Sequence, residues 1–405
     1  MKLLRIYSKE MEKIINRIYL RRKRVEKTVA KIIEDVCNQG DEAVLKYTYK
    51  FDKVKFTPRQ MRVSESEISG AFQDIDSGFI QNFKSIIENV ERFYKKRIKK
   101  SWRIRSEDGV VLGEEVFPLK RIGIYIPAGT APLVSTIYMT VIPAKIAGVE
   151  EIVLVTPPGE RGFVNPYILV VASLLKIKEI YKIGGAQAIA ALALGTKTIK
   201  KVDKIFGPGN AYVTEAKRQV FGYVDVDMLA GPSEVVIIAN RFSNPAFVIA
   251  DLKAQAEHAG SLSILITTSK SLAKLVRYKI EEGYLILVNN LNEAIELANQ
   301  IAPEHLEILV ENPRRIIKKI RTAGCVFVGP YSPVVVGDYV AGPSHVLPTG
   351  GSARFFSALG VEDFMRTSHL VIYSKKALEK AKPLVETIAK IEGMEKHLAS
   401  LNIRF

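Results

Sequence analysis

The stretch I-G-I-Y-I-P-A-G-T-A-P-L-V-S-T, residues 122–136, decides the fold class of this chain. It begins with a short apolar run, continues through a glycine and proline turn, and passes into a helical pattern. Similar units recur along the sequence. Short β-rich runs separated by helix-length segments indicate parallel strands with crossover helices, and hence an open α/β sheet. The runs cover residues 122–126, 152–155, 180–183, 205–206, 235–239, 263–267, 284–288, 326–328 and 334–336.

Ligands are expected at the carboxyl ends of such strands. Three of the runs end in glycine turns that lead into helices, with the sequences P-A-G-T after residue 126, G-G-A-Q after residue 183 and G-P-G-N after residue 206. Such turns expose backbone N–H groups at a helix start, where phosphate is favoured. None matches the G-x-G-x-x-G dinucleotide fingerprint, so each can be a phosphate contact or simply a tight turn.

The composition and the first residues set the class of protein. Residues 1–17 interrupt every apolar run with a charge, which leaves no secretory core or membrane span. The only two cysteines, Cys37 and Cys325, have no second cysteine at a metal-binding spacing. We expect an unexported, cytoplasmic protein with no membrane partner.

The formal net charge of +16 raises a nucleic-acid hypothesis, with basic runs at residues 21–24 and 94–100. Both runs lie in segments predicted to be solvated helices. No helix-turn-helix, zinc-finger or aromatic RNA-binding signature accompanies them. We therefore expect no nucleic-acid partner.

Polar side chains gather in the second half of the chain. The stretch N-P-A-F-V-I-A-D-L-K-A-Q-A-E-H-A-G, residues 244–260, predicts a helix in which Asp251, Gln255 and His258 share one face. These groups can bind a metal or a substrate, or make ordinary hydrogen bonds. The sequence A-P-E-H at 302–305 adds a carboxylate beside an imidazole, and Asp338 follows the predicted strand 334–336.

Nine motifs, in order from about residue 121 to the end, resemble the histidinol dehydrogenase family. They are I-Y-I-P-A-G-T-A-P at 124–132, I-P-A-K-I-A-G-V at 142–149, I-G-G-A-Q-A-I-A-A-L-A-L-G-T at 183–196, I-F-G-P-G-N-A-Y-V-T-E-A-K-R at 205–218, A-G-P-S-E-V at 230–235, Q-A-E-H at 255–258, A-P-E-H-L-E at 302–307, G-D-Y-V-A-G-P-S-H-V-L-P-T-G-G at 337–351 and E-G-M-E-K-H at 392–397.

The resemblance implies an α/β fold of two Rossmann-like parallel-sheet domains, with helical N- and C-terminal segments that mediate dimerisation. The implied division is an N-terminal helical dimer segment at 1–20, a first domain at 21–125 and 233–358 carrying most of the zinc and catalytic residues, an NAD-binding domain at 126–232, and a C-terminal segment at 359–405 that supplies residues to the partner's active site.

It also implies the reaction, a zinc- and NAD-dependent four-electron oxidation of L-histidinol to L-histidine through L-histidinal, in a homodimer with shared active sites. His305 matches the base that takes the alcohol proton, and Glu304 the carboxylate that activates water for the second oxidation. The matched zinc ligands are Gln255, His258, Asp338 and His397, the last lent by a partner chain. The matched substrate contacts are Ser233, Gln255, His258, His305, Asp338, His345, Glu392 and His397, and the matched NAD contacts are Tyr125, Gln187 and Asn210.

The sequence departs from the family pattern at a few points. Leu229 stands where proline is usual, Ala128 where glycine is usual, and Ser344 where asparagine is common, and the stretch 258–304 is shorter than usual. These departures bear on cofactor geometry more than on the reaction. A zinc- and NAD-dependent dehydrogenase of another amino alcohol remains an alternative, against which the retention of Ser233 and Glu392 argues.

Overall fold

The computed structural model describes residues 1–17, 23–128, 132–258 and 260–405. It divides into two compact units: unit 1 comprises Met1–Arg97 and Leu119–Phe364, and unit 2 comprises Ile98–Pro118 and Met365–Phe405. The first two residues of the basic run at 21–24, and residues 129–131 of the first glycine turn, lie outside the described residues. In the described part of the chain, no helix has both the length and the apolar character needed to cross a lipid bilayer.

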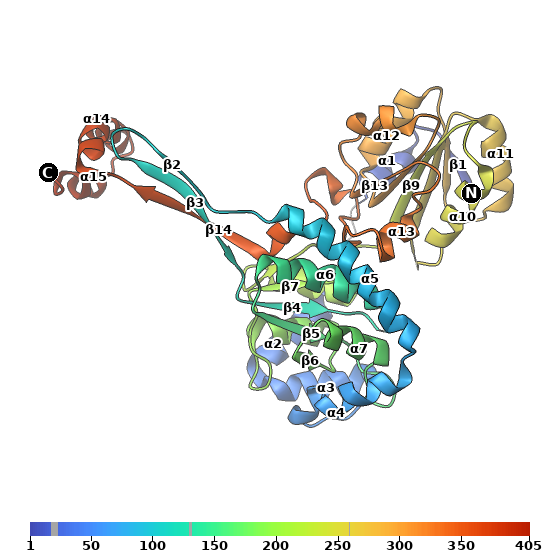
Figure 1. The fold of residues 1–405 in the computed structure, drawn as a ribbon, viewed down its shortest axis with the longest axis horizontal. Coiled ribbons are helices and arrows are strands. Elements are labelled where there is room, and N and C mark those ends of the chain that lie inside the picture. Colours follow the sequence, from blue (N-terminus) through green and yellow to red (C-terminus); the bar gives the residue numbers. More distant parts are fainter. Residues whose placement is uncertain (18–22, 129–131, 259) are drawn as a thin grey trace. The chain divides into compact units, whose positions relative to one another are not determined.

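Unit 1 contains a five-stranded parallel sheet in the order β6-β5-β4-β7-β8 (Figure 1). If these five strands are numbered by their order along the chain, they lie side by side in the order 3-2-1-4-5, which is that of a doubly wound fold. The switch point of this fold lies between β4 and β7. The strands are β4 (Arg121–Tyr125), β5 (Glu151–Val155), β6 (Glu179–Tyr181), β7 (Lys204–Phe206) and β8 (Asp225–Val226). The connecting helices are α6 (Val134–Ala147), α7 (Pro166–Leu174), α8 (Gly185–Leu194) and α9 (Ala211–Val220).

Four helices from the first hundred residues pack against the helices of this sheet: α2 (Lys23–Gln39), α3 (Asp41–Asp52), α4 (Glu65–Ala71) and α5 (Ser77–Tyr94). The apolar face of α2, with Val29 and Ile32, shares a core with Val153 and Ile189. The structure differs here from the predicted division, which grouped residues 21–125 with 233–358. The apolar faces of α2 and α3 are buried against the five-stranded part, and β4 is its central strand.

A second, six-stranded parallel sheet in unit 1 has the order β1-β11-β10-β9-β12-β13. Without β1 it repeats the order of the first sheet. Its strands are β1 (Lys2–Leu4), β9 (Glu234–Ala239), β10 (Leu262–Thr267), β11 (Tyr284–Leu287), β12 (His305–Leu309) and β13 (Cys325–Val328). Its helices are α1 (Lys9–Ile15), α10 (Pro245–Gln255), α11 (Lys270–Lys279), α12 (Leu291–Ile301) and α13 (Val334–Tyr339). The N-terminal segment thus extends a sheet of its own chain, and its predicted role in dimerisation stays a prediction.

Two predicted elements need correction. The helix expected over residues 244–260 begins as predicted, with the Asn244 side chain accepting from the Ala246 N–H, but it ends at Gln255, so His258 lies in the following turn. The strand expected at 334–336 is the first turn of α13. Pro333 directly precedes it in extended backbone, and a proline at that position suits a helix start as well as a strand end.

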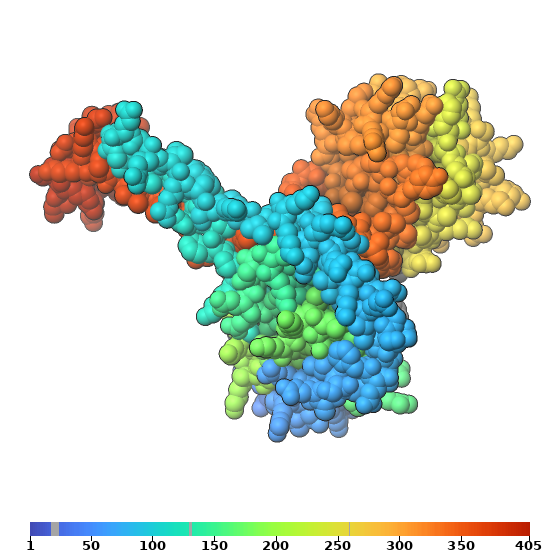
Figure 2. All heavy atoms as spheres, viewed as in Figure 1, coloured from blue at the N-terminus to red at the C-terminus, as the bar shows by residue number. Residues whose placement is uncertain are grey.

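Unit 2 is an antiparallel ribbon in the order β14-β3-β2, followed by two helices. Its elements are β2 (Trp102–Arg105), β3 (Val111–Pro118), β14 (Met365–Ile372), α14 (Lys375–Ile391) and α15 (Glu395–Asn402). Figure 2 shows residues 98–118, in cyan, packed along residues 365–405, in red. On α14 the large apolar side chains Leu384, Ile388 and Ile391 lie on one helical face and are 71%, 56% and 78% exposed.

Short 3-10 turns complete the described chain: η1 (Pro58–Met61), η2 (Phe72–Asp74), η3 (Lys95–Arg97), η4 (Pro313–Arg315), η5 (Ile317–Lys319), η6 (Ser352–Arg354) and η7 (Val361–Phe364).

Candidate active site

Three of the polar residues predicted for chemistry lie at the amino ends of β9 and β12. Ser233 directly precedes β9 and Glu304 directly precedes β12, and the register pairs His305 with Val235. In the six-stranded sheet these predicted site residues therefore lie at the amino ends of strands, whereas ligands were expected at the carboxyl ends. The cause is the sharp turn after α12. Ala302 caps this helix with a left-handed φ of 50°, and the buried strand β12 begins three residues later at His305.

Glu304 is a buried carboxyl with a specific set of donors. One of its oxygens accepts from the Ser233 hydroxyl at 2.7 Å and from the Glu234 N–H at 2.8 Å. Burial raises the pKa of Glu304 to about 7, although the neighbouring His305 and the hydroxyl of Ser233 favour its charged form. A carboxyl with a pKa near neutrality can act as acid or base in water-activating chemistry.

His305 is buried beside Glu304 and is held through one ring nitrogen. Its Nδ1 lies 3.0 Å from the Glu234 carbonyl oxygen and 3.5 Å from a Glu304 oxygen. Since a carbonyl can only accept, Nδ1 carries the proton, and in the neutral ring Nε2 keeps its lone pair. Nε2 has no hydrogen-bond partner among the described residues and lies 3.6 Å from a carboxylate oxygen of Asp338. Burial works to lower the pKa of His305, but the carboxylates of Glu304 and Asp338 outweigh it and raise the pKa to about 9.

Asp338 and His345 lie together next to this pair. Asp338 belongs to α13, and its carbonyl oxygen accepts from the His345 Nδ1 at 2.9 Å. Thr136 of α6 lies 3.4 Å from the other ring nitrogen of His345. Burial lowers the pKa of His345, and the imidazoles of His305 and His258 lower it further. Asp338 thus lies between two imidazoles, those of His305 and His345.

The two predicted ligands from the α10 region differ in their surroundings. Gln255 ends α10 and is 5% exposed, and its Nε2 has no partner among the described residues. His258 is exposed, and its N–H donates to the Gln255 carbonyl oxygen. Within the described residues, no group of three or more His, Cys, Asp or Glu side chains is arranged to hold a metal ion.

The remaining two predicted substrate and metal residues belong to unit 2. Glu392 follows α14, and His397 lies in the first turn of α15. They line a cavity of about 390 Å³ together with apolar residues of the same two helices, Leu384, Val385, Ile388, Ala389 and Met394. That His397 enters the active site of a partner chain stays a prediction.

The three predicted cofactor contacts all lie at the carboxyl edge of the five-stranded sheet. Tyr125 ends β4, and its hydroxyl accepts from the Gly185 N–H at 3.2 Å. Gln187, in the first turn of α8, is 1% exposed and neither end of its amide has a partner among the described residues. Asn210 caps α9 by accepting from the N–H groups of residues 212 and 213.

The turn before Asn210 requires glycine. Gly207 has a φ of 105°, and a Cβ there would lie 2.1 Å from the carbonyl oxygen of Tyr125. The buried Lys217 donates to the Gly207 carbonyl, and the buried Asp227 accepts from its N–H. The G-P-G-N turn is therefore pressed against the end of β4 at the switch point of the sheet, the usual position for a bound ligand.

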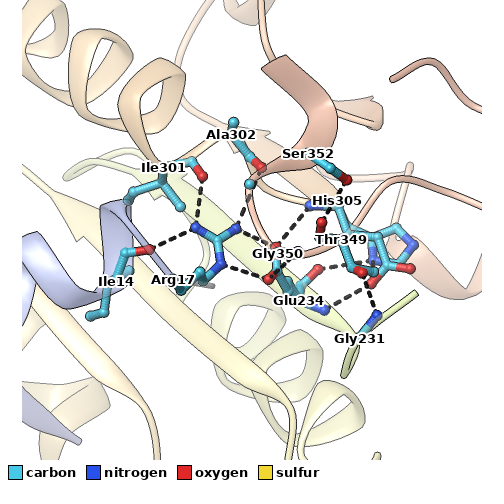
Figure 3. A network of polar contacts seen from close by, with 12 residues as sticks. Ile14, Arg17, Gly231, Glu234, Ile301, Ala302, His305, Thr349, Gly350 and Ser352 are labelled. Carbon is cyan, nitrogen blue, oxygen red and sulfur yellow. Dashed lines mark hydrogen bonds and ion pairs between the residues drawn. The ribbon is translucent and has the colours of Figure 1, made fainter. Parts of the chain in front are cut away.

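Sequence reasoning missed three polar residues that the structure brings into these regions. The backbone of Glu234 donates to Glu304 and accepts from His305. Figure 3 shows Glu234 beside His305. Arg17 pairs with Glu234. Asp52, near Tyr125, has a buried Oδ2 without a partner among the described residues, and burial raises its pKa to about 6. Of the three, only Glu234 could have been found from the sequence. It stands directly before the apolar run V-V-I-I-A, and a carboxylate at the start of a buried strand needs a partner.

The chain matches a family model described as histidinol dehydrogenase over residues 15–405. Histidinol dehydrogenase from Clostridium acetobutylicum is 46% identical over 398 residues, which cover 94% of this chain and 92% of that protein. The one from Caldanaerobacter subterraneus subsp. tengcongensis is also 46% identical, covering 97% of this chain and 95% of that protein. The crystal structure of histidinol dehydrogenase from Elizabethkingia anophelis superimposes with a TM-score of 0.92 at 39% identity, covering 98% of this chain and 95% of that one.

Proposed function

The chain belongs to the histidinol dehydrogenase family, and from this premise we propose that it carries out the complete zinc- and NAD-dependent oxidation of L-histidinol to L-histidine through L-histidinal. Two oxidations remove two hydrides in all, and one water enters between them. We place the reaction in the cytoplasm, where the free Cys37 and Cys325 would remain reduced.

The single observation that carries the proposal is the buried pair Glu304 and His305. An alcohol does not release hydride readily until its proton leaves. His305 holds its Nδ1 proton on the Glu234 carbonyl, which leaves the Nε2 lone pair to take the alcohol proton. Glu304, with a pKa raised to about 7, then accepts a proton from the water that hydrates the aldehyde. His305 would thus serve the oxidation of the alcohol, and Glu304 the oxidation of the aldehyde.

The protonation state of His305 depends on Asp338. While the Asp338 carboxylate is free, it helps to raise the pKa of His305 to about 9, and the ring is charged at neutral pH. Ligation of Asp338 would remove that contribution. The imidazole would then titrate closer to the ordinary histidine range of about 6.5, where a base works near neutrality.

The proposed zinc ligands are Gln255, His258, Asp338 and the partner chain's copy of His397. Two imidazoles and two oxygen donors are a set that zinc accepts. Gln255 is buried at the end of α10 and would bind the ion through its amide oxygen, because the Nε2 that lacks a partner among the described residues is a hydrogen-bond donor. Bound zinc would hold and orient the substrate's imidazole and amine. With Ser233, His345 and Glu392, these residues would form the substrate site.

The proposed NAD contacts are Tyr125, Gln187 and Asn210. The position of Tyr125 and Asn210 at the switch point of the five-stranded sheet supports this assignment, as does the unpartnered amide of Gln187. Bound NAD would accept a hydride in each oxidation. The glycines at 185 and 207, both with positive φ, let the backbone approach a ligand closely.

We also propose a homodimer with shared active sites. The exposed apolar face of α14, with Leu384, Ile388 and Ile391, is the kind of surface that a second chain covers. His397 and Glu392 border that face in the same cavity. A second chain seated there would bring its site to these two polar side chains.

One assay tests the proposal: NADH formation from purified protein, NAD and L-histidinol, repeated after chelation and after zinc is restored. We expect two NADH for each histidinol, and activity that disappears with the metal and returns with zinc. One NADH with accumulated aldehyde would reject the role of Glu304. No NADH with histidinol, but turnover of another amino alcohol, would reject the substrate.

A further inference from the structure

The backbone of one residue, Glu234, contacts both catalytic side chains. The Glu234 N–H donates to the Glu304 carboxylate at 2.8 Å, and the Glu234 carbonyl accepts from His305 Nδ1 at 3.0 Å. A displacement of this residue would therefore move the water-activating carboxyl and release the imidazole from its tautomer together. The position of Glu234 is thus the common reference for both steps of the proposed reaction.

The side chain of Glu234 is held by Arg17 and Gly350, and it also accepts from the backbone N–H of Glu304 at 3.4 Å. Its carboxylate is 1% exposed and accepts from Arg17 Nε at 2.6 Å, from a second nitrogen of the same guanidinium and from the Gly350 N–H at 2.9 Å. Figure 3 shows Arg17, Glu234 and Gly350 in one polar network with His305. The bidentate geometry fixes the direction as well as the distance of the pair.

Arg17 uses all five of its N–H groups in this network. Besides the two bonds to Glu234, it donates to the carbonyl oxygens of Ile14 at 2.8 Å, Ile301 at 2.8 Å and Ala302 at 3.4 Å. Ala302 is the left-handed residue that ends α12, two positions before Glu304. Arg17 therefore reaches the catalytic pair by two routes, through Glu234 and through the turn that introduces β12.

We propose that Arg17 and Glu234 form a positioning pair that fixes Glu304 and His305 in their catalytic geometry, an inference that rests on the proposed function of those two residues. Arg17 touches neither of them and acts through the Glu234 peptide and the Ala302 carbonyl. The N-terminal segment of the chain is in this way part of the catalytic apparatus of its own subunit.

The test compares Arg17→Met, Glu234→Gln and the double variant Arg17→Met/Glu234→Gln in the full-length, zinc-loaded protein. In Arg17→Met the buried Glu234 carboxylate loses its cationic partner, and in Glu234→Gln the Arg17 guanidinium loses its anionic partner. We therefore expect a lower thermal midpoint in each single variant. In the double variant both charges are gone, and the midpoint should recover towards that of the unaltered protein. If the two residues position the catalytic side chains, kcat of the double variant should nevertheless remain about 10- to 100-fold below that of the unaltered protein. Its KM for histidinol and its zinc content should not change.

Arg5→Met is the matched control, since Arg5 is an exposed arginine of the same N-terminal segment. It should leave kcat, KM and the midpoint unchanged. A double variant with a normal kcat per folded molecule would overturn the proposal, because the pair would then contribute stability alone.

A second readout does not depend on the reaction. In protein labelled with ¹⁵N at histidine, the His305 Nδ1 proton bound to the Glu234 carbonyl should give a downfield resonance, assigned by its loss in His305→Asn. We expect the double variant to lose or broaden this signal and Arg5→Met to retain it. An unchanged signal in the double variant overturns the positioning role even if histidinol proves not to be the substrate, so the two failures are distinguishable.

Discussion

Two histidines for which we propose different roles also have different surroundings. His305 is 3% exposed and lies within 3.6 Å of two carboxylates, whereas His258 is exposed in the turn after α10. A buried imidazole with a fixed tautomer suits proton transfer. An exposed one, free to turn, suits a metal ligand.

Substitution should separate these two duties. His305→Asn is expected to lower kcat by about 10²- to 10⁴-fold, the usual loss when a general base is removed, with zinc content retained. His258→Ala should lose zinc and activity together. Metal analysis of the purified proteins beside the NADH assay makes the comparison. Equal zinc loss in both variants would contradict the division.

A second residue-scale prediction concerns Asp52 and pH. Burial raises its pKa to about 6, above the value of about 3.9 expected in the unfolded chain, so the folded protein favours the protonated form. The stability linked to this proton is present below pH 4 and is lost as the pH rises from about 4 to 6. Asp52→Asn should therefore unfold with less dependence on pH across this window. At pH 7 it should be more stable by about 1–2 kcal/mol, a value reduced for the partial exposure of the group.

Urea titrations of both proteins at pH 4, 5, 6 and 7 provide the measurement. The difference between their unfolding free energies should grow with pH and level off above pH 6. A difference that is constant over the series would show that Asp52 does not titrate in this way.

At the scale of elements, α13 is packed against β13 through its glycine. A Cβ at Gly337 would lie 2.5 Å from the ring of Phe327, which itself contacts His305 at 5.9 Å between ring centroids. Gly337→Ala should therefore push α13, and with it Asp338, away from the site. We expect a loss of about 1–3 kcal/mol in unfolding free energy, with lower activity.

Gly70→Ala in α4 is the matched control. A Cβ there meets nothing within 4 Å, and alanine favours helix, so this variant should gain about 0.5–1 kcal/mol. Urea midpoints of the two variants should shift in opposite directions. If Gly337→Ala leaves the unfolding free energy unchanged, the Phe327 ring must move aside without a loss of stability.

The elements also mark how far the sequence could predict this molecule. The short buried runs of both sheets follow directly from β-branched periodicity, and the start of α10 follows from Asn244 and Pro245. Val334–Val336 was misassigned because three valines favour a strand locally, whereas packing on β13 and the Glu307 carboxylate that accepts from the Val334 N–H select a helix. Tertiary contacts decided that segment.

The same limit applies to the site. Glu304 and His305 were predicted from their motif, but their place at the amino ends of strands depends on the turn through Ala302. Arg17 carries no local signal, because its acceptor Glu234 lies 217 residues further along the chain. Contacts of this kind become visible only when both sheets have been assembled.

At the scale of the whole molecule, a shared site can be tested by mixing chains. His305→Asn and His397→Ala should each be nearly inactive alone. After joint refolding of equal amounts, half of the dimers are mixed, and in each of these one site has an intact His305 and receives an intact His397 from the other chain. About a quarter of the normal activity should return. No recovery in confirmed mixed dimers would mean that each chain supplies its own His397.

The reach of Arg17 has a consequence for synthesis on the ribosome. Arg17 leaves the exit tunnel early, while its acceptors at residues 234, 301 and 302, and Gly350, which donates to Glu234, are translated much later. Through most of its elongation, a nascent chain therefore has an Arg17 guanidinium that bonds to water in place of these native acceptors. If Arg17 positions the site as proposed, the complete network around Glu234 can form only after residue 350 has emerged.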